Sequence, residues 1–359
     1  MKALITQLAT NHQATRQELL ELLQAPYEEE FTHFLKQAAQ KTREAAYGKE
    51  VFIRGLLEFT NYCKNNCYYC GIRAGNSKAS RYRLSQEEIL SCCNQGYALG
   101  FRTFVLQGGE DPYFTDEKIC KIVAAIKEAH PDCAVTLSIG EKSRSSYAAY
   151  YQAGADRYLL RHETANSSHY GQLHPPTMSL ANRKRCLWDL KDLGYQVGSG
   201  IMVGSPYQTS QHLLEDLEFL QDLKPDMIGI GPYLNHPDTP FKKQPQGSLK
   251  LTLWLLSLLR LLFPYALLPA TTALGTLHPQ GRSLGLMAGA NVVMPNLSPV
   301  NVREKYSLYA NKLATGAEAA ESLDLLKEEI TKAGFKASMN IGHVNKLAKN
   351  AYLKEINHG

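Results

Sequence analysis

TFVLQGGEDPYFTDEKICKIVAAIKEAHPDCAVTLSIG, residues 103–140, reads as a strand, a helix and a second strand. Its two ends, TFVLQGG and AVTLSIG, are short apolar, β-rich runs that stop at glycine, which is typical of buried strands. Between them, DEKICKIVAAIKEAH has apolar residues at helical spacing and is followed by Pro131. Because a helix that joins two strands carries the chain back across the sheet, the strands pair in parallel. The stretch therefore predicts a parallel α/β fold.

The same unit is repeated along the chain. β-rich apolar runs occupy residues 51–60, 103–109, 134–140, 157–163, 197–204, 227–233, 267–275 and 291–296, with helical periodicity between several of them. Eight parallel strands of this kind close a (β/α)8 TIM barrel. The alternative is an open, doubly wound sheet, but no G-x-G-x-x-G motif follows the first strand. We therefore expect a TIM barrel.

The barrel accounts for residues 49–315 in this interpretation, and the rest of the chain flanks it. Residues 1–48 form an N-terminal helical extension, with helical spacing of apolar residues throughout 15–48. Residues 316–359 contain a closing helix over 317–334 and a basic tail, which we expect to be peripheral.

Composition narrows the classes of function. The chain has 359 residues, 44% of them hydrophobic, which is enough for one large core. The formal charge of +5 comes from scattered Lys and Arg, so nucleic acid is not indicated as a partner. The best membrane candidate, residues 251–268, is short and contains Arg260 and Pro264, which favours a buried helix and no membrane contact. Eight unevenly spaced cysteines and no visible signal peptide predict a reducing cytoplasm without disulfides.

Polar side chains gather where the predicted strands end. Active sites of TIM barrels lie at the carboxyl ends of the strands. Polar residues inside a sheet are costly unless they are paired, so several at one end indicate a site. The residues at these ends are Asn61, Gln107, Glu110, Glu141, Arg161, Glu163, Met202, Tyr233, Thr271, Thr272 and Asn296.

Three cysteines follow the first strand in TNYCKNNCYYCGIR, residues 60–73. Cys63, Cys67 and Cys70 have the spacing C-x-x-x-C-x-x-C, and thiolates suit zinc or iron–sulfur clusters. A structural zinc is normally closed by four ligands, but no second cysteine pair and no nearby His complete the set. A 4Fe-4S cluster held by three cysteines leaves one iron open for a cofactor, and Tyr69 is placed to pack near it. A zinc-bearing scaffold without catalysis remains the alternative of a different class.

The triplet resembles the signature of the radical S-adenosylmethionine (SAM) superfamily. Further segments resemble the HydE family of iron-iron hydrogenase maturases, over about residues 50–315: RYRLSQEEI, VLQGGEDPY, GADRYLLRHETAN, IGIGPYLNHPDTP, PATTALGT and ANVVMPNLSP. The resemblance implies one 4Fe-4S cluster, and reductive cleavage of SAM to a 5′-deoxyadenosyl radical. It also implies a small organometallic or amino-acid-like substrate, a low-potential electron donor and transient docking to other hydrogenase maturases.

The resemblance also implies site residues. Cys63, Cys67 and Cys70 would hold the cluster. The residues implied for SAM are Tyr69 beside the cluster, Gln107, Gly108 and Gly109 near the methionine ammonium, Glu163 for the ribose, Arg183 for the carboxylate, and Met202 and Met227 in the adenosyl pocket. The residues implied for the substrate are Thr136, Arg161, Thr271, Thr272 and Tyr306. Adjacent threonines on a strand face opposite ways, so both can serve only if the backbone bends there. His162 alternates away from Glu163 and is expected to be a satisfied outer-layer histidine.

Some features separate this chain from its relatives. Members of the family with a second cluster have cysteines near the chain end, whereas the last cysteine here is Cys186, so we expect no second cluster. Methylornithine synthase is similar in the triplet and barrel, but would need acidic residues for a diamino acid. Biotin synthase would need further ligands at the strand ends. The isolated cysteines, which we assign to packing, are Cys92, Cys93, Cys120, Cys133 and Cys186.

Overall fold

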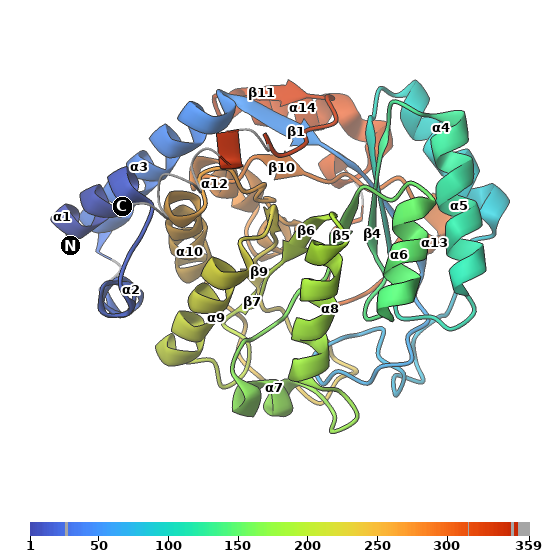
Figure 1. The fold of residues 1–359 in the computed structure, drawn as a ribbon, viewed down its shortest axis with the longest axis horizontal. Coiled ribbons are helices and arrows are strands. Elements are labelled where there is room, and N and C mark those ends of the chain that lie inside the picture. Colours follow the sequence, from blue (N-terminus) through green and yellow to red (C-terminus); the bar gives the residue numbers. More distant parts are fainter. Residues whose placement is uncertain (26–27, 315, 346–347, 351–359) are drawn as a thin grey trace.

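A ring of parallel strands surrounded by helices forms the centre of the molecule (Figure 1). The computed structural model describes residues 1–25, 28–314, 316–345 and 348–350. Six strands form one parallel sheet in the order β2 (Gly55–Thr60), β3 (Thr103–Gly108), β4 (Ala134–Ser138), β5 (Arg157–Leu159), β6 (Gln196–Ser199) and β8 (Met227–Ile228). The parallel α/β fold predicted from residues 103–140 is confirmed.

The remaining strands continue the ring. β1 (Glu50–Ile53) lies between β10 (Val292–Val293) and β11 (Lys336–Ser338), and β7 (Met202–Val203) pairs with β9 (Gly231–Pro232). Single parallel bridges join Met227 to Leu267, Pro269 to Val292 and Asn296 to Leu56, which leads from β8 back to β2. The arrangement is TIM-barrel-like, with single bridges in place of a continuous ladder beyond β8.

Helices cover the outside of the ring (Figure 1). The longer ones are α4 (Gln86–Ala98), α5 (Asp116–Ala129), α6 (Arg144–Gln152), α8 (Leu180–Asp192), α9 (Ser210–Leu223), α10 (Leu249–Leu262) and α14 (Leu323–Lys332). The shorter ones are α7 (Ser167–Leu173), α11 (Thr272–Leu277), α12 (Gly281–Met287) and α13 (Val300–Arg303). Helix α5 shows why they form: Thr115 caps its first turn, and its buried side chains recur every three or four residues.

The hydrophobic stretch at residues 251–268 is a buried helix, as predicted. Nearly all of α10 is buried, and Arg260 donates to the carbonyl oxygens of Gly289 and Pro264 at 2.9 and 2.7 Å. Its charged head is thus satisfied inside the protein. In the described ranges, no helix is long and apolar enough to cross a membrane.

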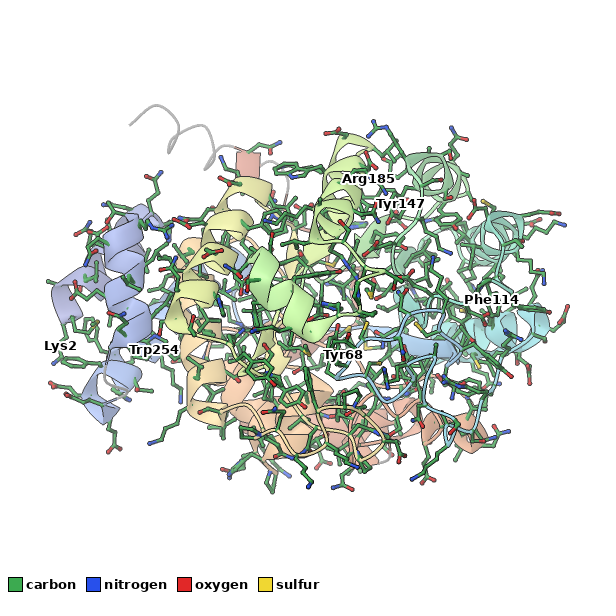
Figure 2. The ribbon with its side chains drawn as sticks, turned by 90° about the horizontal axis from the view of Figure 1, so that it is seen from below. Lys2, Tyr68, Phe114, Tyr147, Arg185 and Trp254 are labelled. Atoms are coloured by element: carbon green, nitrogen blue, oxygen red, sulfur yellow. The ribbon has the colours of Figure 1, made fainter. Side chains whose placement is uncertain are left out.

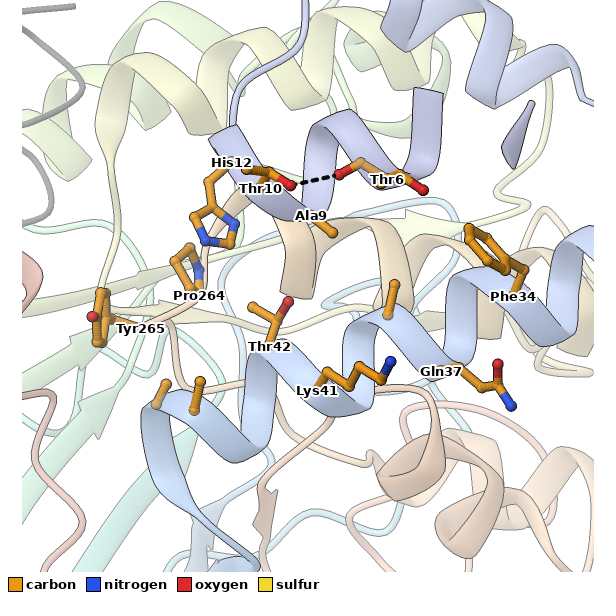
Figure 3. A pocket seen from close by; sticks show the side chains of 13 residues that line it. Thr6, Ala9, Thr10, His12, Phe34, Gln37, Lys41, Thr42, Pro264 and Tyr265 are labelled. Carbon is orange, nitrogen blue, oxygen red and sulfur yellow. Dashed lines mark hydrogen bonds between the residues drawn. The ribbon is translucent and has the colours of Figure 1, made fainter. Parts of the chain in front are cut away.

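Three N-terminal helices lie on one side of the molecule: α1 (Lys2–Asn11), α2 (Arg16–Gln24) and α3 (Glu29–Tyr47) (Figure 1). The predicted helical stretch 15–48 is therefore two helices. Helices α1 and α3 and the segment Pro264–Tyr265 line a cavity of about 520 Å³, shown in Figure 3. This cavity is formed outside the strand ring.

Residues 336–344 are not peripheral, which corrects the expectation for this part of the C-terminal segment; residues 351–359 lie outside the described residues. β11 pairs with β1, and residues 341–344 close the amino end of the ring. Arg157 Nη2 and Thr103 Oγ1 both donate to the carbonyl oxygen of Ile341 at 2.9 Å, and Arg54 Nη2 donates to that of Gly342 at 3.2 Å. Because Arg157 and Thr103 begin β5 and β3, these contacts lie at the strands' first residues.

The predicted strand 267–275 is wrong in its second half. The chain bridges to its neighbours only at Leu267 and Pro269, after which Thr271 precedes the first turn of α11. A threonine in extended conformation just before a helix is a common helix start. The backbone therefore bends between Thr271 and Thr272.

Candidate active site

The cysteine triplet lies in the loop that follows β2, at the carboxyl end of the strand ring. This loop is held from several sides. Gly71 N–H donates to Leu308 O at 2.9 Å, and Tyr68 N–H donates to Leu173 O at 3.0 Å. Arg81 also donates to the carbonyl oxygens of Ile72 and Arg73 at 2.8 and 2.7 Å. These contacts with the rest of the protein position the loop.

The three thiols share one environment. Burial raises the pKa of Cys70 to about 12, with a further contribution from Cys63. The pKa of Cys67 is also raised, first by burial and then by Cys70. A bound metal removes such protons outright, so these thiols suit a metal centre better than free thiolate chemistry.

The arrangement fits a cluster better than a single ion. The loop at residues 60–73 offers three cysteine thiols and contains no histidine. Zinc needs ligands that converge on one point. The cysteines of a 4Fe-4S cluster instead bind separate irons. The soft thiolates of Cys63, Cys67 and Cys70 therefore fit the iron–sulfur cluster predicted from the sequence.

A glycine turn at the end of β3 lies directly against the cysteine loop. A Cβ atom on Gly109 would lie 2.1 Å from Tyr62 O and 2.8 Å from Cys63 Cβ. On Gly108 it would lie 2.8 Å from Thr60 Cγ2. Only glycine allows so close an approach of two backbones. Beside the turn, Gln107 Nε2 donates to the hydroxyl of Tyr306 at 3.4 Å, so these two predicted site residues are in contact.

Glu163 follows β5 in an unusual backbone conformation. Its φ is 66°, a left-handed value that is costly for any residue with a side chain. Its N–H donates to Gly200 O at 3.1 Å. The buried Oε2 lies 3.2 Å from Arg161 Nη2, but in the described part of the chain it has no hydrogen-bond partner of good geometry. The strained backbone thus holds the Glu163 carboxylate at the rim, by which we mean the carboxyl ends of the strands and the loops that follow them. There Oε2 can still accept a hydrogen bond.

Tyr69 is fixed by a histidine that the sequence did not reveal. Its hydroxyl donates to His174 Nε2 at 3.0 Å, while His174 Nδ1–H donates to Tyr170 O at 3.0 Å. Burial, and then the charge of Arg183, lower the pKa of His174 to about 3. The imidazole is therefore neutral, as an acceptor from Tyr69 requires. Tyr69 also packs against a group of buried apolar side chains that includes Met202.

Arg183 lies buried on α8 near the same side chains. Its Nε is 2.7 Å from Glu141 Oε1, yet neither atom has a well-aligned hydrogen bond to any described residue. A buried guanidinium with spare donors is suited to a carboxylate ligand, because it can bind both oxygens.

Deeper polar groups are also left without partners. Thr136 Oγ1, Thr271 Oγ1 and both Nε and Nη2 of Arg161 are buried and form no hydrogen bond with the described chain. Native proteins satisfy most buried polar atoms, so such a set needs an explanation. Tyr306, also predicted for this cavity, is fully buried. A bound anion would satisfy the hydroxyls and the guanidinium.

Two predicted site residues lie elsewhere. Met227 begins β8 and packs with Phe52, Leu267, Val292 and Val344 at the amino end, so it does not line the same pocket as Met202. Thr272 Oγ1 donates to Glu318 Oε2 at 2.9 Å, because the backbone bend turns it into the barrel wall. His162 is buried, as expected, and its Nδ1 contacts Ser199 Oγ at 2.9 Å, but its Nε2 lies 3.4 Å from Asp216 Oδ1 and has no hydrogen bond to a described residue, so the histidine is only partly satisfied.

Two buried carboxylates were missed. Glu58 on β2 is fully buried and binds Lys312 Nζ at 2.6 Å, and it also accepts from Asn296 Nδ2 at 2.8 Å. Glu318 forms an ion pair with Arg282. The signal for Glu58 was an acid inside an apolar strand, but its partner lies 254 residues further along.

Strands in a ring, a cysteine loop at their carboxyl ends and unpartnered polar groups beside it define a radical SAM enzyme. The sequence profile of the radical SAM superfamily matches residues 57–220. The [FeFe] hydrogenase maturase subunit HydE of Thermotoga maritima is 44% identical over 312 residues, which are 87% of this chain and 89% of that protein. The chain belongs to the HydE family of radical SAM enzymes.

Methylornithine synthases are also similar. The 3-methylornithine synthase of Methanosarcina barkeri is 31% identical over 281 residues, covering 78% of this chain and 79% of that protein. The crystal structure of methylornithine synthase (PylB) has a TM-score of 0.83 at 28% identity, over 93% of this chain and 97% of that one. This similarity supports the fold and leaves the substrate to be argued from the site.

Proposed function

We propose that this enzyme cleaves SAM reductively and uses the resulting 5′-deoxyadenosyl radical to assemble the di-iron centre of [FeFe] hydrogenase. The observation that carries the proposal is a set of buried polar atoms that lack a well-aligned hydrogen bond, on Glu163, Arg183, Arg161, Thr136 and Thr271. Arg161 and Glu163 form an ion pair with each other, and Arg183 forms one with Glu141. The 44% identity with HydE supports the same activity.

One set of residues would bind the iron–sulfur cluster, and another set would bind SAM. Cys63, Cys67 and Cys70 would hold one 4Fe-4S cluster, which when bound supplies the electron that cleaves the sulfonium of SAM. Arg183 would bind the methionine carboxylate, and Glu163 would accept from the ribose hydroxyls. Burial of both groups strengthens these charged hydrogen bonds and excludes water from the radical.

The deeper groups favour an anionic or carboxylate-bearing substrate. Arg161 offers a guanidinium with unused donors, and Thr271 and Thr136 offer hydroxyls. Two buried acids of the barrel wall, Glu58 and Glu318, are already neutralised by Lys312 and Arg282 and offer no carboxylate to a diamino acid. These contacts favour a cysteine-bound iron species over lysine as substrate, and hydrogenase maturation over methylornithine synthesis.

The free cysteines and the need for an electron donor favour a reducing cellular compartment. All eight cysteines are unpaired in the structure, which suits a reducing cytoplasm. The enzyme also needs a low-potential electron donor, and it would hand its product to other maturases.

Complementation tests the proposal. The chain is expressed in a hydrogenase-producing bacterium from which its own HydE has been deleted, and hydrogen evolution is measured. We expect recovery with the wild-type chain and none with Cys67→Ala. In parallel, the purified enzyme is incubated with SAM, reductant and lysine. Formation of methylornithine without recovery of hydrogenase would contradict the proposal.

A further inference from the structure

An aromatic side chain is exposed at the rim beside the cysteine loop. Tyr207, between β7 and α9, has 54% of its surface exposed. Its φ is 67°, a left-handed value that costs free energy for a tyrosine. Strained residues of this kind concentrate at functional sites, and a large exposed aromatic ring often marks a binding surface.

A row of aromatic rings leads from Tyr207 to the cysteine loop. Its ring is 6.2 Å from that of Phe241 in an edge-to-face contact, and Phe241 is 6.0 Å from Tyr68 in another. Gln244 Nε2 donates to the Tyr207 hydroxyl at 3.3 Å, and Phe241 N–H donates to Tyr68 O at 3.4 Å. Tyr68 follows Cys67 directly; Figure 2 labels Tyr68 and views the molecule from the side where its loop lies.

The surface around this row is basic. Residues 61–80, 200–209 and 233–248 contain five Lys or Arg and one acid, Asp238. Asp238 is already paired with Lys78 at 3.0 Å. Lys242 and Lys243 are exposed next to Phe241, and neither ammonium has an ion-pair partner within the described chain. Lys64 lies 3.5 Å from Glu110, so Lys242 and Lys243 are the lysines of these segments that have no ion pair with a described residue.

We propose that Tyr207, Lys242 and Lys243 form the docking surface for an acidic, low-potential electron-transfer protein that carries a flavin or an iron–sulfur group. The inference rests on the proposed function, because reductive SAM cleavage consumes one electron from outside the chain. The donor loses one electron and the cluster gains it; no atom is transferred. An acidic partner is complementary to the lysines, and a brief encounter needs only a small, charged surface with one aromatic anchor.

Charge reversal tests the surface. The double variant Lys242→Glu/Lys243→Glu is compared with Lys49→Glu/Lys336→Glu, which makes the same charge change at exposed lysines beside β1 and on β11. Tyr207→Asn removes the ring and keeps a residue that tolerates positive φ. The probe is an acidic bacterial flavodoxin. Its Kd for the reconstituted enzyme is measured by calorimetry at low and high salt.

We expect the rim variant to weaken flavodoxin binding on the order of tenfold at low salt, and less at high salt, because salt screens exposed charges. The control pair should bind as wild type, and Tyr207→Asn should weaken binding at both salt concentrations. Equal affinity of the rim and control variants would overturn the proposal.

Turnover separates docking from the chemistry. With flavodoxin hydroquinone as reductant, the rim variant should form 5′-deoxyadenosine more slowly, whereas with dithionite it should match wild type. An equal loss with both reductants would overturn a docking role. If wild type forms no 5′-deoxyadenosine with dithionite, the proposed function fails, and the Kd comparison still decides whether this face binds the donor.

Discussion

Arg157 and Arg161 lie four residues apart, at the two ends of the strand ring, and their guanidinium groups meet different surroundings. Arg157 begins β5 and donates to Thr103 Oγ1 at 3.2 Å and to Ile341 O at 2.9 Å. Arg161 follows β5 and has an ion pair with Glu163 but no hydrogen bond from Nε or Nη2 to the described chain. Arg157 Nε also lacks a partner among the described residues, but both terminal nitrogens of Arg157 are bonded by the protein, whereas Arg161 Nη2 lacks a well-aligned hydrogen bond. The carboxyl end is therefore the site.

The largest effect should come from removing a cluster ligand. Cys67→Ala deprives the cluster of one of its three thiolates, so anaerobically reconstituted protein should lose most of its iron and sulfide. Cys120→Ala is the control, since Cys120 lies on α5, away from the loop. Iron and acid-labile sulfide are measured per chain. Full iron content in Cys67→Ala would contradict the assignment of the triplet.

Adding a side chain to the glycine turn should lower the iron content nearly as much as removing a cysteine ligand. In Gly109→Ala the new Cβ would meet Tyr62 O at 2.1 Å, so the turn and the cysteine loop must separate. We expect a several-fold drop in bound iron. Gly171→Ala in α7 is the matched control, because in the described structure nothing lies within 4 Å of its added Cβ. Equal iron content in both variants would show that the contact does not position the loop.

The same substitution at the two arginines tests the comparison directly. Arg157→Met removes hydrogen bonds that hold residues 341–344, and should lower the free energy of unfolding by about 2–4 kcal/mol. Arg161→Met should change it by less than about 1 kcal/mol, since few contacts are lost, while abolishing hydrogenase maturation. Urea unfolding and complementation give the two readouts. Loss of maturation in a stable Arg157→Met, together with unchanged maturation in Arg161→Met, would place the site at the amino end of the ring and contradict the comparison.

The smallest effect concerns pH. Because His174 has its pKa lowered to about 3, the unfolded chain binds a proton below about pH 6.5 that the native state does not. Native stability is therefore lost as pH falls from 6.5, by at most about 1.4 kcal/mol per pH unit from this group. His174→Gln should flatten the dependence seen in urea unfolding of the apoprotein between pH 7.5 and 5.5. The exposed His33→Gln should leave it unchanged.

The sequence predicted the fold where structure is local. Helix α5 and strands β3 and β4 follow from apolar periodicity, from the glycines that end the strands and from Pro131 after the helix. The pairing of β11 with β1 could not be predicted, since it joins segments some 280 residues apart and β11 is only three residues long. The strand predicted through Thr272 failed because threonine suits both a strand and a helix start.

The site was predictable where residues share a loop and less so where they meet through the fold. The cysteine triplet and the glycine turn were visible as motifs. Met227 begins the predicted strand 227–233, so its place at the amino end, away from the site, could already be inferred from the sequence. His174 and the Glu58–Lys312 pair were missed because Tyr69 lies 105 residues from His174, and Lys312 lies 254 residues from Glu58. The acid inside the apolar run 51–60 was a local sign that Glu58 is buried, but it did not indicate the partner.

The most direct test of the central claim is the cleavage of SAM itself. The reconstituted protein is incubated anaerobically with SAM and dithionite, and 5′-deoxyadenosine is quantified by chromatography for wild type and Cys67→Ala. We expect 5′-deoxyadenosine from wild type and none from Cys67→Ala. No product from a wild-type protein shown to hold its cluster would contradict it.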